Sequence, residues 1–143
     1  MQHWHEFVMN HLLLFAALLA VLVLLVINLV GDLFAAAKFL SPAETVRLIN
    51  QEEPVVIDLR DAGEFGNGHL DNALNVPQGK LAERMSELER YRDKNVLLCC
   101  ASGSACGGAS NQLKKNGFSK VFALRGGVAA WQQDNLPLVR NKK

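Results

Sequence analysis

VLLCCASGSACGGASNQLKKNGF, residues 96–118, is the part of the sequence that most clearly indicates the fold. An apolar run ends in Cys100, a loop of Ala, Ser and Gly follows, and a helical pattern then continues as far as Gly117. Where a strand passes into a helix, unpaired backbone N–H groups and the positive end of the helix dipole stabilise a thiolate. We therefore predict that Cys100 is a nucleophile near the start of a helix.

Strand and helix patterns alternate on both sides of this stretch. Short apolar runs predict strands over residues 55–59, 73–76, 96–99 and 121–124. Helical patterns are expected from residue 41, over one turn at 61–65, and over residues 80–91, 106–116 and 127–133. This alternation predicts an α/β domain with a mainly parallel sheet flanked by helices. Because parallel strands end at one edge, Asp58, Arg60 and Cys100 are expected there.

Two of these helices carry specific local signals. Ser41 is placed as an N-cap, Pro42 as the first helical residue and Glu44 as the partner in a capping box, with Val46 and Ile49 on the buried face. Residues 80–91 place Leu81, Met85 and Leu88 on one stripe among charged side chains. That spacing predicts one continuous amphipathic helix.

Residues 12–30 contain no charged side chain and only one polar side chain, Asn28. A helix of this length spans about 28 Å, close to the thickness of the hydrocarbon core of a bilayer. We expect a transmembrane helix. The competing interpretations are a buried core helix and a cleaved signal peptide, since Ala35, Ala36 and Ala37 resemble a cleavage site. The absence of Lys and Arg before this segment argues against a signal peptide.

All 15 Lys and Arg residues lie from Lys38 onward. The positive-inside rule therefore predicts that the N-terminus faces outward and that the following domain lies in the cytoplasm. The formal net charge of +1 is too small to indicate a nucleic-acid partner. The expected organisation is a short N-terminal segment (1–11), a transmembrane helix (12–30), a linker (31–40), the domain (41–137) and a solvated basic tail (138–143).

The chain has three cysteines, an odd number, which does not indicate a disulfide framework. In a strand, the adjacent Cys99 and Cys100 point to opposite faces, so Cys99 is expected in the core. Zinc ligation is not expected, because neither C-x-x-C nor a paired His motif is present. The sequence indicates neither a metal nor a cofactor.

Two segments of this chain resemble the halves of a rhodanese domain. The first is IDLRDAGEFGNGHLDNALNVP, residues 57–77, with its D-x-R strand end, G-H-L turn and A-x-N-V-P strand. The second begins at Val96 and contains the strand ending in Cys, the small loop, the Val-Phe strand and the L-R-G-G turn leading to Trp131. With its apolar N-terminal segment, the chain resembles small membrane-anchored bacterial members of this family.

The resemblance implies sulfurtransferase chemistry. In the family the cysteine at the strand end takes a sulfane sulfur from a donor, carries it as a persulfide and passes it to a nucleophilic acceptor. Here that cysteine is Cys100, and the donor would be thiosulfate, a polysulfide or a protein persulfide. The loop residues expected to surround the sulfur with backbone N–H groups are Ala101, Ser102, Gly103, Ser104 and Ala105. Gly107 and Gly108 are expected to let the backbone approach closely.

This chain departs from the family pattern at Ala105, where active loops commonly carry an Arg. Without that guanidinium, thiosulfate binding is expected to weaken by roughly 1.5–3 kcal/mol. Cys106 stands where the family more often has Ser or Thr, and three roles remain open for it. It is a second sulfur acceptor, a resolving thiol that forms a disulfide with Cys100, or an isosteric replacement for Ser.

Other polar residues near the loop have structural interpretations. Asp58 and Arg60 are expected to pair with each other or with backbone behind the loop, and His69 to belong to a structural turn. Two functions are therefore open. The first is a membrane-tethered sulfurtransferase or sulfur carrier with a bilayer and a sulfur-relay protein as partners. The second is a rhodanese-like module without turnover, which docks a partner or senses redox state through its thiols.

Overall fold

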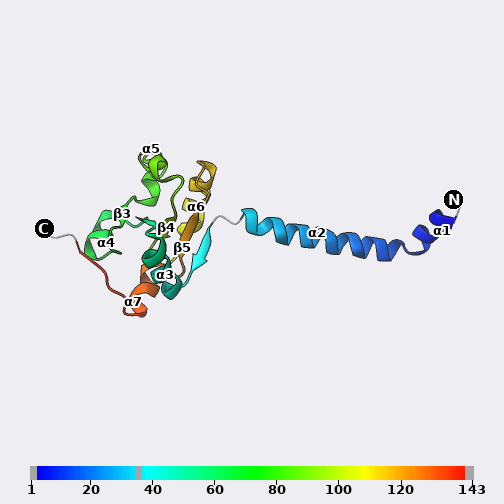
Figure 1. The fold of residues 1–143 in the computed structure, drawn as a ribbon, viewed down its shortest axis with the longest axis horizontal. Coiled ribbons are helices and arrows are strands. Elements are labelled where there is room, and N and C mark those ends of the chain that lie inside the picture. The colour runs from blue at the N-terminus through cyan, green and yellow to red at the C-terminus, as the bar shows by residue number, and fades with distance from the viewer. Residues whose placement is uncertain (1–2, 35–36, 141–143) are drawn as a thin grey trace. The chain divides into compact units, whose positions relative to one another are not determined.

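The computed structural model describes residues 3–34 and 37–140 of the 143-residue chain. The chain divides into two compact units, Met1–Ala35 and Ala36–Lys143, and each is described by itself. The first unit holds two helices, and the second holds a sheet with its surrounding helices (Figure 1). This division matches the composition, because the apolar segment and the alternating strand and helix patterns occupy separate parts of the sequence.

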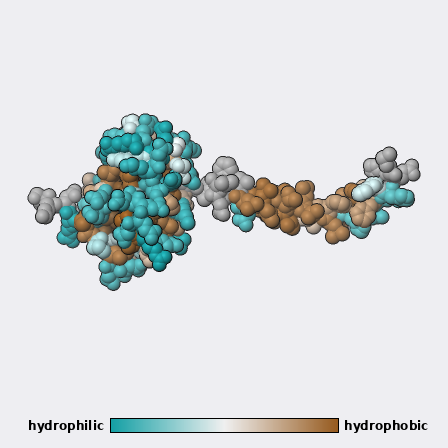
Figure 2. All heavy atoms as spheres, in the orientation of Figure 1, coloured by the Kyte–Doolittle hydropathy of each residue, from teal (hydrophilic) through white to brown (hydrophobic). Residues whose placement is uncertain are grey.

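The N-terminal unit consists of α1, His3–Asn10, and the longer α2, Leu12–Phe34. Within α2, the stretch Leu12–Leu29 is apolar and long enough to cross a membrane. None of this stretch is buried within the protein, and the face of the helix seen in Figure 2 is mostly apolar. The sequence therefore forms the helix that was expected, which extends past residue 30 to Phe34.

The second unit is built on a five-stranded sheet with the order β1-β5-β4-β2-β3. Every pairing between these strands is parallel, which confirms the predicted α/β class. The strands are β1 Lys38–Leu40, β2 Val55–Asp58, β3 Leu74–Asn75, β4 Val96–Cys99 and β5 Val121–Leu124. The most central strand, β4, is buried along its whole length and leads directly into the loop after Cys99.

Helices cover both faces of the sheet. The α-helices of this unit are α3 Pro42–Glu52, α4 Ala62–Asn67, α5 Met85–Leu88, α6 Cys106–Lys115 and α7 Gly127–Gln133, and the 3-10 turns are η1 Gln78–Lys80 and η2 Glu89–Tyr91. Side chains of α5 and α6 pack in one core cluster, and those of α3 and α7 pack in the other. In Figure 1 these two pairs accordingly lie on opposite sides of the strands.

The side chains of β4 alternate between the two clusters. Val96 and Leu98 pack on the α6 face, whereas Leu97 and Cys99 pack on the α7 face. All four are fully buried. Because both faces are covered, the strand is apolar throughout and does not alternate with polar residues.

The start of α3 has the predicted capping box. Glu44 N–H donates to Ser41 Oγ, and Ser41 N–H donates to Glu44 Oε2 at 2.8 Å. The buried face is shifted from the predicted one, since Thr45 and Leu48 are buried. Val46 and Ile49 are half-buried at the margin of the α7-side cluster. The helix therefore packs on the sheet through Thr45 and Leu48 more than through Val46 and Ile49.

The expected continuous helix over residues 80–91 is wrong. Leu81, Met85 and Leu88 are buried as predicted, but the backbone forms η1, turns, the single turn of α5 and then η2. Arg84 leaves the helical region and its guanidinium donates to Asn75 O at 2.7 Å. Short helices gain little from propagation, so these tertiary contacts determine the backbone path.

Both ends of the expected domain also differ from the sequence interpretation. Lys38–Leu40, expected in the linker, forms edge strand β1 and pairs with β5. At the other end, Val139 forms a bridge with His69, and Arg140 Nε donates to Asn67 O at 3.0 Å. Residues 138–140 are therefore not a free tail, because backbone pairing holds them against the domain. Residues 141–143 of the expected tail lie outside the described residues.

Candidate functional site

Cys100 lies directly after β4, at the carboxyl edge of the sheet. It is 3% exposed and packs on the α6 side. The loop that follows turns back over its side chain, so that Gly103 N–H donates to Cys100 Sγ at 2.9 Å. Gly103 has φ of 93°, a left-handed conformation that favours glycine. The predicted placement of a thiol between a strand and a helix is confirmed.

Cys106 is the first residue of α6, and its side chain points at Cys100. The two Sγ atoms lie 3.2 Å apart, with Cys106 donating and Cys100 accepting. This hydrogen bond is the main cause that lowers the pKa of Cys100 to about 6, and backbone N–H groups of Ala105, Gly103 and Cys106 add to it. The same bond, together with burial, raises the pKa of Cys106. These opposite shifts favour a thiolate on Cys100 beside a protonated thiol on Cys106.

The neighbouring Cys99 has the opposite environment. It is fully buried in the α7-side cluster, which confirms the predicted core position. Burial is the largest cause that raises its pKa, and the nearby Asp58 carboxylate raises it further. Cys99 is therefore a protonated thiol without access to solvent.

Asp58 and Arg60 form a buried ion pair beside Cys99. Arg60 Nη2 lies 2.7 Å from Asp58 Oδ2, and the two side chains are 9% and 1% exposed. The same Nη2 donates to Gly68 O at 2.7 Å, which ties the strand end to α4. Asp58 is paired in register with Cys99 of β4. Both residues lie at the expected edge, where their side chains bind each other and Gly68 O, just after α4.

The start of α7 forms hydrogen bonds with the backbone of Cys100 and of the residue after it. Val128 N–H donates to Cys100 O at 2.8 Å, and Ala129 N–H donates to Ala101 O at 3.1 Å. A Cβ added at Gly127 would lie 2.3 Å from Cys100 O, so only glycine fits there. The sequence signal for this contact is the Gly-Gly pair between β5 and α7.

The close approach expected at Gly107 and Gly108 is wrong. A Cβ at Gly107 would meet nothing within 4 Å, and one at Gly108 would be 3.6 Å from Gln78 Nε2. Both glycines lie on the open side of the first turn of α6, since Cys106 and Ala109 occupy the buried side. Crowding around the loop arises at Gly103 and Gly127 instead.

Gln78 is a neighbour of the loop that sequence reasoning missed. Its exposed side chain donates from Nε2 to Ala105 O at 3.4 Å. It directly follows Pro77, which ends the A-x-N-V-P segment. That motif gives the position of Gln78 in the sequence but does not indicate its contact with Ala105 O. Of the five predicted loop residues, Ala101, Ser102 and Ser104 are exposed, whereas Gly103 is buried and Ala105 is half-buried.

His69 has the structural role that the sequence suggested. Its Nδ1 lies 2.8 Å from Phe65 O, and its ring stacks on that of Phe65 at a centroid distance of 3.7 Å. Its backbone pairs with Val139. None of these contacts involves the cysteines.

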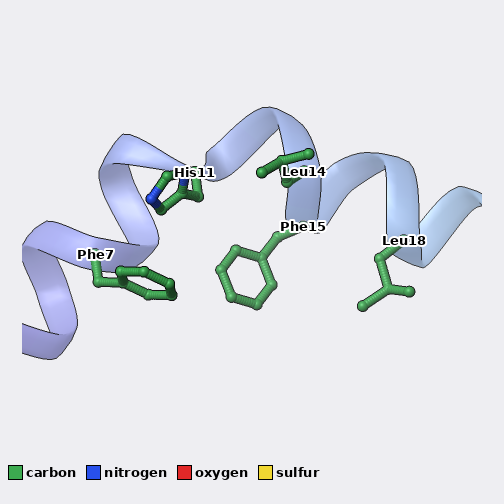
Figure 3. Close-up of a pocket in the computed structure, with 5 residues that line it drawn as sticks. All are labelled: Phe7, His11, Leu14, Phe15 and Leu18. Atoms are coloured by element: carbon green, nitrogen blue, oxygen red, sulfur yellow. The ribbon is translucent and has the colours of Figure 1, made fainter.

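Two surface hollows lie away from Cys100. One of about 210 Å³ is lined by side chains of α1 and α2, where the Phe7 and His11 rings meet edge to face (Figure 3). A second, of about 230 Å³, lies between α3 and α7 and includes Ile49, Leu70 and Trp131. Among the described residues, no group of three or more His, Cys, Asp or Glu side chains could hold a metal ion. Cys100 therefore lies under a loop and outside these hollows.

Comparisons with known proteins agree with this geometry. The family model of the rhodanese-like domain matches residues 41–134. The uncharacterized protein YibN of Escherichia coli (strain K12) is 40% identical over 143 residues, covering 99% of this chain and 100% of the relative. The similarity to YibN thus includes the apolar N-terminal helix as well as the domain.

Solved structures share the fold of the domain. A rhodanese-related protein from Thermoplasma volcanium has a TM-score of 0.66 and 27% identity, over 73% of this chain and 99% of the other. A thiosulfate sulfurtransferase from Pseudomonas aeruginosa has a TM-score of 0.65 and 24% identity, over 75% of this chain and 21% of the other. This second likeness shows the fold alone.

Proposed function

Because this chain belongs to the rhodanese-like domain family, which is related to sulfurtransferases, we propose that it is a sulfurtransferase or sulfur carrier with a persulfide on Cys100. The observation that carries the proposal is the environment of the Cys100 sulfur. It accepts hydrogen bonds from Gly103 N–H and from Cys106, and its pKa is lowered to about 6. A thiolate is the nucleophilic form of cysteine, so Cys100 is ready to react at neutral pH.

The proposed reaction has two steps. The Cys100 thiolate attacks a sulfane sulfur, the bond from that sulfur to the rest of the donor breaks, and the donor fragment leaves with the electron pair. An external nucleophile then attacks the outer sulfur of the persulfide and restores the thiolate. The N–H groups of the loop stabilise the negative charge on sulfur in both states, because they are already oriented toward it.

The loop limits which donors are suitable. Residues 101–105 carry no charged side chain, so no guanidinium in the loop can bind the sulfonate of thiosulfate. Arg60, the cation closest in sequence to the strand end of β2, is already bound to Asp58 and Gly68 O. We therefore expect polysulfides or a protein persulfide to be better donors than thiosulfate.

Intact-protein mass spectrometry tests the proposal. The full chain in detergent is exposed to thiosulfate, to polysulfide or to a persulfidated cysteine desulfurase. We expect a gain of about 32 Da, the mass of one sulfur atom. The gain should be lost in Cys100→Ala and kept in Cys99→Ala, which removes the adjacent but buried thiol. No gain with any donor, in this chain or in Cys106→Ser, would contradict the proposal.

We also propose that α2 crosses the bacterial inner membrane with the domain in the cytoplasm. The support is the exposed apolar length of α2 and the position of all 15 Lys and Arg residues after it. A core helix of a soluble domain would be buried, whereas Leu12–Leu29 is not. A bilayer would remove this surface from water.

Cysteine labelling tests this orientation at two exposed sites, Ser119 and His3. In a background without the native cysteines, an impermeant thiol reagent should label His3→Cys in intact spheroplasts. The same reagent should label Ser119→Cys only after lysis. The reverse pattern would overturn the orientation, and labelling of both sites before lysis would contradict a membrane-spanning α2.

The uncharged loop also favours a second candidate function. A rhodanese-like module without turnover would use its thiols to sense redox state, or its surface to dock a partner at the membrane. Under this alternative the Cys100 thiolate reacts with oxidants but takes no sulfur from any donor. The mass measurement separates the two functions, since only the first produces the gain of one sulfur.

A further inference from the structure

We propose that Cys106 is a second reacting residue of this site. Its sulfur attacks Cys100 Sγ of the persulfide, releases hydrosulfide and leaves a Cys100–Cys106 disulfide. The inference rests on the proposed function, because it begins from the persulfide on Cys100. Sulfur bound to Cys100 then leaves by reduction to hydrosulfide, in addition to transfer to an external acceptor.

The distance between the two sulfur atoms supports this step. Cys106 Sγ lies 3.2 Å from Cys100 Sγ, within the roughly 3–3.5 Å that separates reacting atoms in a near-attack geometry. A disulfide needs about 2.05 Å, so the sulfurs must approach by only about 1.2 Å. The intervening residues are all small, which limits the steric cost of that movement.

Burial determines what Cys106 can reach. The residue has no exposed surface, whereas Cys100 is 3% exposed, so Cys100 is the thiol that an external donor contacts first. The atom that it contacts is Cys100 Sγ, which becomes the inner sulfur of the persulfide. Cys99 is excluded as a partner because it lies in the core cluster on the other face of the sheet. The geometry therefore favours a resolving thiol over an independent sulfur acceptor.

The step balances in atoms and electrons. The reactants are the Cys100 persulfide anion and the Cys106 thiol, and the products are the disulfide and one hydrosulfide anion. The outer sulfur of the persulfide anion takes the proton of Cys106, and the thiolate so formed attacks Cys100 Sγ. The bond between the inner and outer sulfur then breaks, and hydrosulfide leaves with the electron pair. The outer sulfur is reduced to sulfide while the two cysteines are oxidised together.

A full cycle requires a dithiol reductant. Such a reductant attacks the Cys100–Cys106 disulfide, becomes a disulfide itself and restores the Cys100 thiolate and the Cys106 thiol. The predicted partner is therefore a thiol-disulfide protein or a small dithiol, and the predicted product is hydrosulfide. This partner differs from the nucleophilic acceptor of a simple transferase, which needs no reductant.

The test follows one loaded protein over time. The full chain carrying Cys99→Ala, in detergent, is loaded with polysulfide, desalted and sampled for intact mass and released hydrosulfide. We expect the species heavier by about 32 Da to become one about 2 Da lighter than the reduced protein, with one hydrosulfide per chain. Fragmentation of the peptide should place the bridge between Cys100 and Cys106.

The matched variant is Cys106→Ser in the same background, since serine can donate a hydrogen bond but cannot form a disulfide. We expect its persulfide to persist and its hydrosulfide release to fall at least tenfold. Equal persistence of the persulfide in both proteins would overturn the inference and leave the proposed function intact. No gain of sulfur in either protein would contradict the proposed function itself. If Cys106→Ser does not fold, the time course of the protein that keeps Cys106 decides the question alone.

Discussion

Cys99 and Cys100 are adjacent in sequence, yet the two faces of the sheet give them opposite chemistry. Cys99 lies in a closed apolar cluster beside the Asp58 carboxylate, and both features raise its pKa. Cys100 lies under a loop whose N–H groups and Cys106 thiol lower its pKa to about 6. Burial alone therefore does not set thiol reactivity, because both cysteines are buried. Hydrogen-bond donors directed at the sulfur make the difference.

The largest effect is expected from a change under the Cys100 face. In Gly127→Ala, the added Cβ would lie 2.3 Å from Cys100 O, at a backbone φ of 63°. We expect the free energy of unfolding to fall by more than about 3 kcal/mol, because backbone must shift to relieve the clash. Urea unfolding in detergent followed by Trp131 fluorescence, with Trp4→Phe to remove the second signal, measures this. A loss below about 1 kcal/mol would show that the loop tolerates displacement.

A change on the Cys99 face should affect stability without affecting the thiolate. Asp58→Asn leaves the Arg60 cation without its buried counter-charge, which we expect to cost about 3 kcal/mol of stability. The midpoint for alkylation of Cys100 should stay near pH 6, since Cys106 and backbone N–H groups of the loop, and not Asp58, hold its pKa low. An alkylation titration of both proteins checks this, and a shift of a full pH unit would show that the two faces are coupled.

A third change removes the main cause of the low pKa of Cys100. Cys100 should be about nine-tenths thiolate at pH 7, and its alkylation rate should fall as the pH drops through 6. In Cys106→Ala we expect the midpoint to rise by roughly 1–2 pH units, because a hydrogen bond to a charged group is lost. Cys106→Ser should shift it less. An unchanged midpoint in Cys106→Ala would assign the activation to the backbone N–H groups alone.

The smallest effect is expected at Gly107, which serves as the control for Gly127. A Cβ at this position meets no atom within 4 Å, and the residue lies in the first turn of α6. We expect Gly107→Ala to change stability by less than about 1 kcal/mol, and in the stabilising direction, because alanine favours the helix. The same urea unfolding measures it. Clear destabilisation would mean that α6 needs a flexible start.

Much of the fold could be predicted because its signals are local. The alternation of strand and helix patterns indicated the parallel sheet, and the Ser41 capping box appears where expected. Residues 80–91 have the correct buried side chains but not the expected backbone, because contacts such as that of Arg84 with Asn75 O determine its path. Strand β1 is only three residues long, so it has no pattern of its own and depends on pairing with β5.

The site was predictable in part for the same reason. The position of Cys100 between a strand and a helix follows from neighbouring residues, and so does the uncharged loop. The contact of Gly127 with Cys100 O joins segments far apart in the chain, as does that of Gln78 with Ala105 O. Single-sequence patterns do not report such distant contacts. The expected crowding at Gly107 and Gly108 was wrong because it depended on which side of α6 faces the core.

That Cys99 and Cys100 face opposite sides follows from the sequence, since side-chain direction in a strand alternates with each residue. So do the thiol at the start of α6 and the absence of a cation from the loop between the cysteines. The short distance of 3.2 Å from Cys106 Sγ to Cys100 Sγ, and the hydrogen bond between them, depend on the tertiary structure. The physical reason is the path of the loop, which the left-handed turn at Gly103 and the packing of Gly127 against the Cys100 backbone define together.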